Sequence, residues 1–377
     1  MIQRRRDASR RYERVLTLLM PPLLLFCCGC PFGPQNSDVP GDGDGGPVDT
    51  GDNGSLNSAT ALNLRAANDQ LVFRGSIDGS ADIDVFDLGT LATGDRLFVD
   101  VQRTGGNLDP TAAIFDSREH LIIFNDDREP DGSNLNPRID IVIPGDTGKY
   151  FLAIIAYPGR VSTGEYEVSV RVQRGAGSSA PQQQTLFLDW RGGEVTIPNV
   201  GAYTLSPFSA ADVGLSANET AAFKDRVQQL VQSSYDDYDL QVLNSDDDAK
   251  PAGAHSTMYF GGSDADAFAI SEQIDGLNAD PSDDAIIFTS SYKTAFSGAS
   301  FEELAQAVAN TVAHEMGHLL GLIHTRDCNG LMDTTCYNER LFAPQAFKTS
   351  RVDESVFPFG WQDAQEILTW VLGLVGF

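Results

Sequence analysis

The chain has 377 residues, which is enough for two ordinary domains with cores of their own. Its 26 Lys and Arg residues against 53 Asp and Glu residues give a formal net charge of -27. Because phosphate backbones are bound by clustered Lys and Arg, this charge argues against a nucleic-acid partner. Calcium, which is often bound by carboxylates, is the more natural partner for such a surface.

Residues 1–30 are predicted to be an export signal. Six arginines precede the uncharged run VLTLLMPPLLLF, which is short for a transmembrane helix and is interrupted by two prolines, so cleavage is favoured. The following FCCGC resembles the cleavage site of a bacterial lipoprotein. It makes Cys30 the candidate lipidation site, with Cys27 and Cys28 as alternative acceptors. Membrane attachment through this lipid and plain secretion both remain open, and both place the chain outside the cytoplasm.

Two segments of small and polar residues are predicted to be unstructured. Residues 31–56 are mainly Gly, Pro and Asp, and they have too little apolar surface to offset the entropy of ordering. We expect them to form a disordered tether or tail. Residues 174–183, GAGSSAPQQQ, are predicted to link two domains.

Residues 57–173 are predicted to form an all-β sandwich. Short segments of alternating polarity follow one another with turn residues between them, and no long helix interrupts them. The predicted strands are QLVFRGSI, DVFDLGTL, RLFVDVQ, TAAIFD, LIIFND, IDIVI, YFLAIIA and YEVSVRV. These motifs, together with GKYFLAIIA and TGEYEVSVRV, resemble the pre-peptidase C-terminal type of β-sandwich that is attached to many secreted bacterial proteases. In that family the module usually follows the peptidase.

Clustered oxygen-bearing side chains in this domain are candidate calcium ligands. They are Asp82, Asp84, Asn125, Asp126 and Asp127. The alternative interpretation is that they are ordinary turn residues. The domain's single histidine, His120, is expected to lie at the surface or at a strand end.

Residues 184–377 are predicted to form an α/β (or α+β) domain. TLFLDW, YDLQVLN, STMYFGG and DAIIFTS are predicted strands. A helix is expected over 216–235, and a second begins with the capping box of Ser300 and Glu303 and ends at Gly321. A C-terminal helix is predicted to pack on the core through Ile367, Leu368, Val371, Leu372 and Val375.

The segment HEMGHLLGLIH holds three of the five histidines of the chain. His314 and His318 are four residues apart, so their rings leave one helix face a turn apart, as two ligands of one metal require. Gly321 lets the backbone leave the helix so that His324 can return to the same ion. Three imidazoles on zinc leave a position for water, and Glu315 is placed to accept its proton.

The full pattern H-E-x-x-H-x-x-G-x-x-H, followed by NGLMD, resembles the metzincin clan of zinc metallopeptidases. The resemblance implies the zinc ligands His314, His318 and His324, the general base Glu315 and a turn around Met332 beneath the metal. It also implies protein or peptide substrates bound along an edge strand, which we expect within YFGGSDADAFAIS.

The predicted function is therefore that of an exported zinc endopeptidase acting through a zinc-activated water. The alternative is an inactive or highly selective surface binding or adhesion protein on a peptidase scaffold. A hydrolase of non-protein amides is a further alternative.

Cys328 and Cys336 are the only cysteines outside the signal region, so in an exported chain they are predicted to form a disulfide around the methionine turn. The residue after the third histidine often identifies the metzincin subfamily. Thr325 at this position does not assign one. Matrixin-like and pappalysin-like enzymes both stay open. Tyr337 is expected to contact substrate or a residue near the metal.

Overall fold

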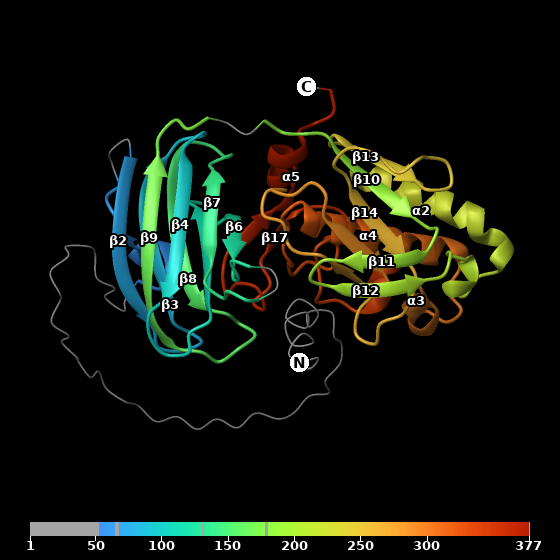
Figure 1. Ribbon diagram of the computed structural model, residues 1–377, viewed down its shortest axis with the longest axis horizontal. Helices are drawn as coiled ribbons and strands as arrows, with labels where there is room; N and C mark the ends of the chain where they lie inside the picture. The colour runs from blue at the N-terminus through green and yellow to red at the C-terminus, as the bar shows by residue number, and fades with distance from the viewer. Residues whose placement is uncertain (1–52, 65–67, 130–131, 178–179, 377) are drawn as a thin grey trace.

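The computed structural model describes residues 53–64, 68–129, 132–177 and 180–376 (Figure 1). The predicted export signal, Cys30 and the predicted tether up to residue 52 lie outside the described residues. The described chain forms a β-sandwich followed by a mixed α/β region, as predicted. No helix within the described ranges is long and apolar enough to cross a membrane.

The β-sandwich consists of two sheets with the strand orders β1-β3-β8-β5-β6 and β2-β9-β4-β7. The short β1 pairs parallel to β3, and every other pairing in these two sheets is antiparallel. All eight predicted strands are present, and the short helix η2 and β1 precede them. Their bounds are η2 Leu56–Ser58, β1 Thr60–Ala61, β2 Asn68–Ile77, β3 Ile83–Leu91, β4 Arg96–Arg103, β5 Pro110–Asp116, β6 Leu121–Asn125, β7 Arg138–Val142, β8 Gly148–Ala156 and β9 Gly164–Gln173.

The α/β region is built on a five-stranded sheet of order β13-β10-β14-β16-β15. Four strands run parallel, and β15 pairs antiparallel to β16 at one edge. The predicted strands correspond to β10, β13, β14 and β16. The elements are β10 Gln184–Asp189, β11 Gly193–Ile197, β12 Gly201–Leu205, η3 Ala210–Asp212, η4 Ala217–Glu219, α2 Thr220–Ser234, β13 Leu240–Asn244, β14 Ser256–Phe260, β15 Ala269–Ser271, β16 Asp284–Ile287, α3 Thr289–Ala295, α4 Phe301–Leu319, η5 Asn338–Phe342, β17 Thr349–Arg351, β18 Trp361–Asp363 and α5 Ala364–Leu372.

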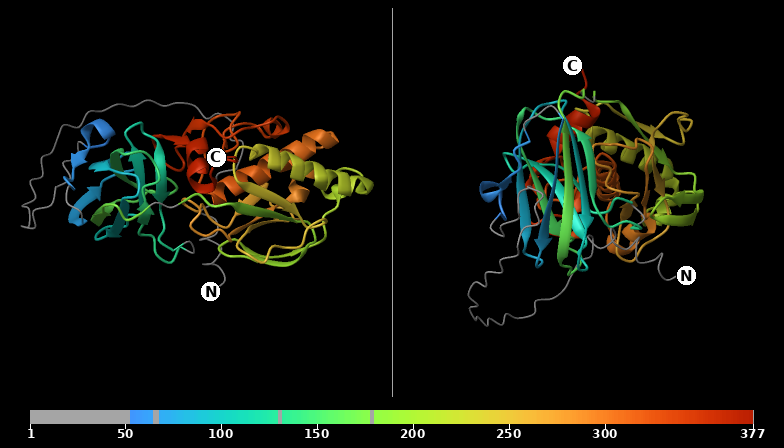
Figure 2. Two further views of the ribbon diagram at one scale, coloured as in Figure 1. Left: turned by 90° about the horizontal axis from the view of Figure 1, so that it is seen from above. Right: turned by 60° about the vertical axis from the view of Figure 1, so that its left-hand side comes forward.

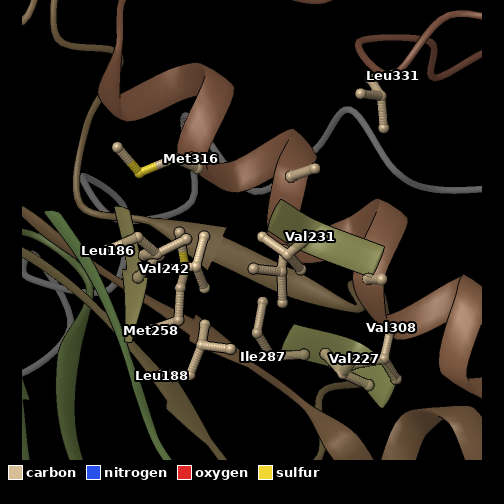
Figure 3. Close-up of a cluster of buried hydrophobic side chains, with 14 of the residues drawn as sticks. Leu186, Leu188, Val227, Val231, Val242, Met258, Ile287, Val308, Met316 and Leu331 are labelled. Carbon is tan, nitrogen blue, oxygen red and sulfur yellow. The ribbon is translucent and has the colours of Figure 1, made fainter. Parts of the chain in front are cut away.

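Helices α2 and α4 lie on one face of this sheet (Figure 2). The side chains of Leu186, Val242 and Ile287 meet Val231 and Val308 of the helices there (Figure 3). The opposite face is covered by the β11–β12 hairpin, which the sequence did not predict, through a separate apolar cluster that includes Ile286 of β16. Successive side chains of a strand point to opposite faces, so β16 divides its apolar residues between the two layers.

The predicted helices α2 and α5 bury the apolar residues that were expected to pack on the core, with one exception. Phe223, Val227 and Val231 of α2 are fully buried. In the C-terminal segment α5 ends at Leu372, and Val375 is 60% exposed beyond it. The prediction that Val375 belongs to the packed face was wrong, because Gly373 ends the helix with a positive φ of 77°.

The β-sandwich and the α/β region share a buried apolar interface. Phe115 of β5 stacks on Phe359 at 4.8 Å between ring centroids and lies 5.3 Å from Phe357. Trp361 donates its backbone N–H to the carbonyl of Glu119 at 2.9 Å. The segment that carries β17, β18 and α5, red in Figure 1, lies between the two regions.

This interface explains why β5 and β8 are buried along nearly their whole length. Ala112 and Ile114 face the sandwich core, whereas Ala113 and Phe115 face the α/β region. An antiparallel sheet commonly leaves one face to water, but here both faces are covered. The two regions are therefore packed against each other across this sheet.

Candidate metal centre

Helix α4 delivers the first two predicted ligands. Ser300 and Glu303 form the expected capping box, in which the backbone N–H of Ser300 donates to Glu303 at 2.8 Å. The helix then runs through the core, and all its residues from Ala307 to Leu319 are buried. Burial on every side fixes the helix position, so His314 and His318 project from a rigid element.

The chain leaves α4 through a Schellman motif centred on Gly321. The N–H of Leu322 donates to the carbonyl of Gly317 at 2.8 Å, and the N–H of Gly321 donates to that of His318 at 2.9 Å. Gly321 has a φ of 93°, which L-residues rarely adopt. This turn reverses the chain so that His324 comes back to the helix end.

Replacing Gly321 by Ala is expected to lower the free energy of unfolding by about 2–4 kcal/mol, because strain at positive φ adds to a steric clash. A Cβ there would lie 2.7 Å from the backbone nitrogen of Leu277. Gly298→Ala is the matched control, since Gly298 has a φ of 88° but open space around its Cβ position. Urea denaturation of both variants checks this. An equal loss of unfolding free energy in Gly321→Ala and Gly298→Ala would show that the structure relieves the clash at Gly321.

The three predicted histidines come together at their Nε2 atoms. Nε2 of His318 lies 3.0 Å from Nε2 of His314 and 3.0 Å from Nε2 of His324. Tetrahedral zinc with Zn–N bonds of about 2.0–2.1 Å needs nitrogens about 3.3–3.4 Å apart. The triangle is thus close to the spacing of three nitrogens on one metal ion.

Hydrogen bonds at the other ring nitrogens set the tautomers. Nδ1 of His314 lies 2.6 Å from the carbonyl of Leu331, and Nδ1 of His318 lies 2.8 Å from the carbonyl of Leu322. A carbonyl only accepts, so each Nδ1 carries the hydrogen and donates it. Each Nε2 is left with a lone pair, which is the form that binds metal.

Burial keeps the imidazoles of His318 and His324 neutral. His314, His318 and His324 are between 5% and 9% exposed. Burial lowers the pKa of His318 to about 3, with a further lowering from His314, and burial also holds the pKa of His324 well below its ordinary value. Uncharged buried nitrogens with lone pairs directed at one another are repulsive unless a cation lies between them. The donor set therefore fits a zinc ion.

Glu315 lies next to this triangle and is 4% exposed. The hydroxyl of Ser271 donates to its carboxylate at 2.5 Å. Burial raises the pKa of Glu315, while His314 and Ser271 act in the opposite direction. A carboxylate with a raised pKa beside a metal site is suited to accept a proton. Ser271 was not predicted as a site residue, although it ends the segment in which the edge strand was expected.

Met332 lies in a turn and packs against helix α4 at Gly317, between His314 and His318 in the sequence. It is 2% exposed, and its Sδ lies 2.7 Å from where a Cβ on Gly317 would be. Its carbonyl accepts the N–H of Thr325 at 2.8 Å, which ties the turn to the chain beside His324. Gly317 thus gives the helix room for the methionine.

The predicted disulfide between Cys328 and Cys336 is present, with a Cα–Cα distance of 5.5 Å, and it closes the loop that contains Met332. Replacing both cysteines by Ser is expected to lower the free energy of unfolding by about 2–3 kcal/mol, because a short closed loop restricts the unfolded chain. Denaturation of the oxidised protein, the reduced protein and the double variant checks this. An unchanged midpoint in the double variant would contradict it.

One pocket of about 90 Å³ contains the three histidines and Glu315. Ile270 and Ser271 of the edge strand β15 line one side. β15 is an edge strand, as expected, and among the described residues no strand pairs with its outer row of backbone groups. The remaining side of the pocket includes residues of the β-sandwich, which the sequence did not predict.

The candidate calcium ligands do not form one group. Asp82 and Asp84 lie at the start of β3, and Asn125 to Asp127 lie at the end of β6, with β8 and β5 between those strands. Three strand spacings amount to about 14 Å, so the two sets cannot share an ion. Asp84 accepts a hydrogen bond from Tyr166, and Asp126 lines the histidine pocket. Calcium binding by either set stays a prediction.

Two further predicted positions are placed by the structure. Tyr337, at the start of η5, is 64% exposed and is not among the residues that line the histidine pocket. Its expected contact with substrate or with a residue near the metal stays a prediction. His120 lies between β5 and β6 and forms a bridge with Trp361 at the interface of the two regions.

No protein-family model and no curated protein matches the chain. Among solved structures, the g-type lysozyme inhibitor PliG of Aeromonas hydrophila is 15% identical, over 30% of this chain and 96% of that chain, with a TM-score of 0.24. The pre-peptidase C-terminal domain of a Bacillus anthracis collagenase is 18% identical, over 30% of this chain and 93% of that chain, with a TM-score of 0.23. Matches at this level assign neither a family nor an activity.

Proposed function

We propose that the chain is an exported zinc-dependent endopeptidase of the metzincin type, in which Glu315 is the general base. The observation that carries the proposal is the convergence of three imidazole Nε2 atoms beside a buried carboxylate in one pocket. The turn of Met332 beneath the helix supports the same class. The disulfide of Cys328 and Cys336 favours an oxidising compartment outside the cytoplasm.

Each residue of the site has a separate role in the proposed reaction. His314, His318 and His324 would hold zinc, which supplies Lewis-acid chemistry by lowering the pKa of water toward about 7 and polarising a carbonyl. Glu315 accepts the proton of the attacking water and later gives it to the leaving amine. Ser271 holds the Glu315 carboxylate in place through its hydroxyl.

The substrate would bind along β15. The free edge of this strand can pair with an extended peptide through backbone hydrogen bonds, and β15 ends at Ser271, next to Glu315. A peptide bound there passes the catalytic carboxylate. Sequence-independent backbone pairing then provides affinity, and side-chain pockets provide selectivity.

A second candidate function is that of a highly selective or inactive surface binding protein on a peptidase scaffold. The intact Glu315 favours catalysis.

Metal analysis and cleavage assays on the purified full chain test the proposal. We expect about one zinc per chain, cleavage of unfolded casein, loss of both with 1,10-phenanthroline and recovery on adding zinc. Folded protein without zinc would overturn the metal centre. Zinc without cleavage of casein or of a peptide library would favour the binding protein.

A further inference from the structure

We propose that the β-sandwich is the second wall of the catalytic cleft and restricts the substrate to a single extended, unfolded segment of chain. The inference rests on the proposed peptidase function and names the class of substrate that reaches the site. It assigns to the sandwich a direct role in substrate selection.

The histidine pocket lies between the two regions. Thr111, Phe124 and Tyr157 of the sandwich line it together with Ile270 and Ser271 of β15. The sandwich thus stands across the pocket from the strand along which a peptide would pair. A substrate has to enter between them.

The strand register explains how these side chains reach the pocket. Thr111 of β5 is two residues before Ala113 and four before Phe115, so all three project from the face that meets the α/β region. Thr111 pairs with Ile155 of β8, and Tyr157 follows two residues later on the same face. The packed interface therefore continues directly into the pocket.

The sandwich side also offers a polar group without a partner. Thr111 is 1% exposed, and its Oγ1 forms no hydrogen bond within the described residues. Leaving a buried hydroxyl unpaired costs about 1–3 kcal/mol, and a backbone group of a bound peptide would remove that cost. In a mainly apolar pocket, such a group is typical of a ligand site.

The wall is held in a fixed position. Arg118 of the sandwich pairs with Glu366 of α5 at 2.8 Å, and a Cβ on Gly360 would lie 2.5 Å from the ring of Phe115. Together with the stacking of Phe115 and Phe359, these contacts hold the two sides of the cleft close together. Between them lies a pocket of about 90 Å³, and an extended chain is the narrowest form of a polypeptide that could enter it.

The test presents one cleavable ten-residue sequence to the zinc-loaded full chain in two forms. One form is the free peptide, and the other is the same sequence in an exposed loop of a folded host protein. We expect kcat/KM to be at least about tenfold higher for the free peptide. Subtilisin serves as the reference enzyme and has to cut both forms, which shows that the loop is exposed.

Phe124→Ala probes the wall itself, and Phe98→Ala is the matched control. Phe124 is a partly buried residue of the pocket, whereas Phe98 is a partly buried residue of β4 in the opposite sheet, packed beneath Arg138. We expect Phe124→Ala to reduce the preference for the free peptide at least about threefold and Phe98→Ala to leave it unchanged. Circular dichroism and zinc content verify both variants, and Phe124→Leu replaces Phe124→Ala if the latter does not fold.

Equal cleavage of the two forms by the unmodified chain would overturn the inference and leave the peptidase function standing. Equal behaviour of the Phe124 and Phe98 variants would likewise show that the sandwich is not a substrate wall. Absence of cleavage of either form by zinc-loaded protein would overturn the proposed function and the inference together.

Discussion

Glu315→Gln is expected to lower kcat/KM for peptide cleavage by about 10²–10⁴-fold while zinc content and fold stay unchanged. Gln has nearly the same shape as Glu, and its amide oxygen can still accept the hydroxyl of Ser271. It has no basic oxygen to take a proton, however. Because Glu315 is only 4% exposed, bulk water cannot readily replace the lost base.

The measurements for this variant are steady-state kinetics, zinc analysis and thermal unfolding. Glu302→Gln is the control, since Glu302 lies on the same helix but is exposed and pairs with Arg226 at 3.0 Å. Its kinetics should match those of the unmodified chain. Activity retained in Glu315→Gln with normal zinc would show that another group accepts the proton.

His318→Ala is expected to abolish stoichiometric zinc binding and, with it, cleavage. His318 is the central member of the triangle, 3.0 Å from each of the other two nitrogens. Its loss leaves two ligands, fewer than the three protein ligands of a catalytic zinc site. A metal that binds only the folded state raises Tm as its concentration increases above Kd. This rise of Tm with added zinc should therefore disappear in His318→Ala.

Zinc content after dialysis and Tm with and without zinc check this result. His255→Ala is the control, because His255 lies outside the site, with Nδ1 2.7 Å from the carbonyl of Gly253. It should keep zinc and its stabilising effect. If His318→Ala retains one zinc per chain, the ion is held by other residues, and the assignment of the three histidines is wrong.

The parts that sequence predicted are those that depend on local pattern. Eight sandwich strands follow from alternation and turns, and α4 follows from the box of Ser300 and Glu303. The histidine triangle follows because a helix spacing of four and one glycine set its geometry within eleven residues. Local backbone rules are sufficient for each of these features.

Two of the missed parts, the contact of Ser271 and the interface between the two regions, depend on contacts between distant segments. Ser271 meets Glu315 across 44 positions of sequence and lies on a strand of three residues, too short to show a period. The interface between the two regions could have been predicted from the sequence of two strands. TAAIFD and YFLAIIA are continuous apolar runs, and continuous runs indicate a sheet covered on both faces.

Residues 349–363, which follow α4 in the sequence, complete the surroundings of His324. Chains are synthesised from the N-terminus, so the residues of the sandwich and of α4 are made before this segment. Val352 then forms a bridge with Thr325, and Asp353 donates its N–H to the carbonyl of His324. The backbone beside His324 is thus held by residues that are made after it. A chain interrupted before residue 349 would carry all three histidines and still lack the backbone contacts that Val352 and Asp353 make beside His324.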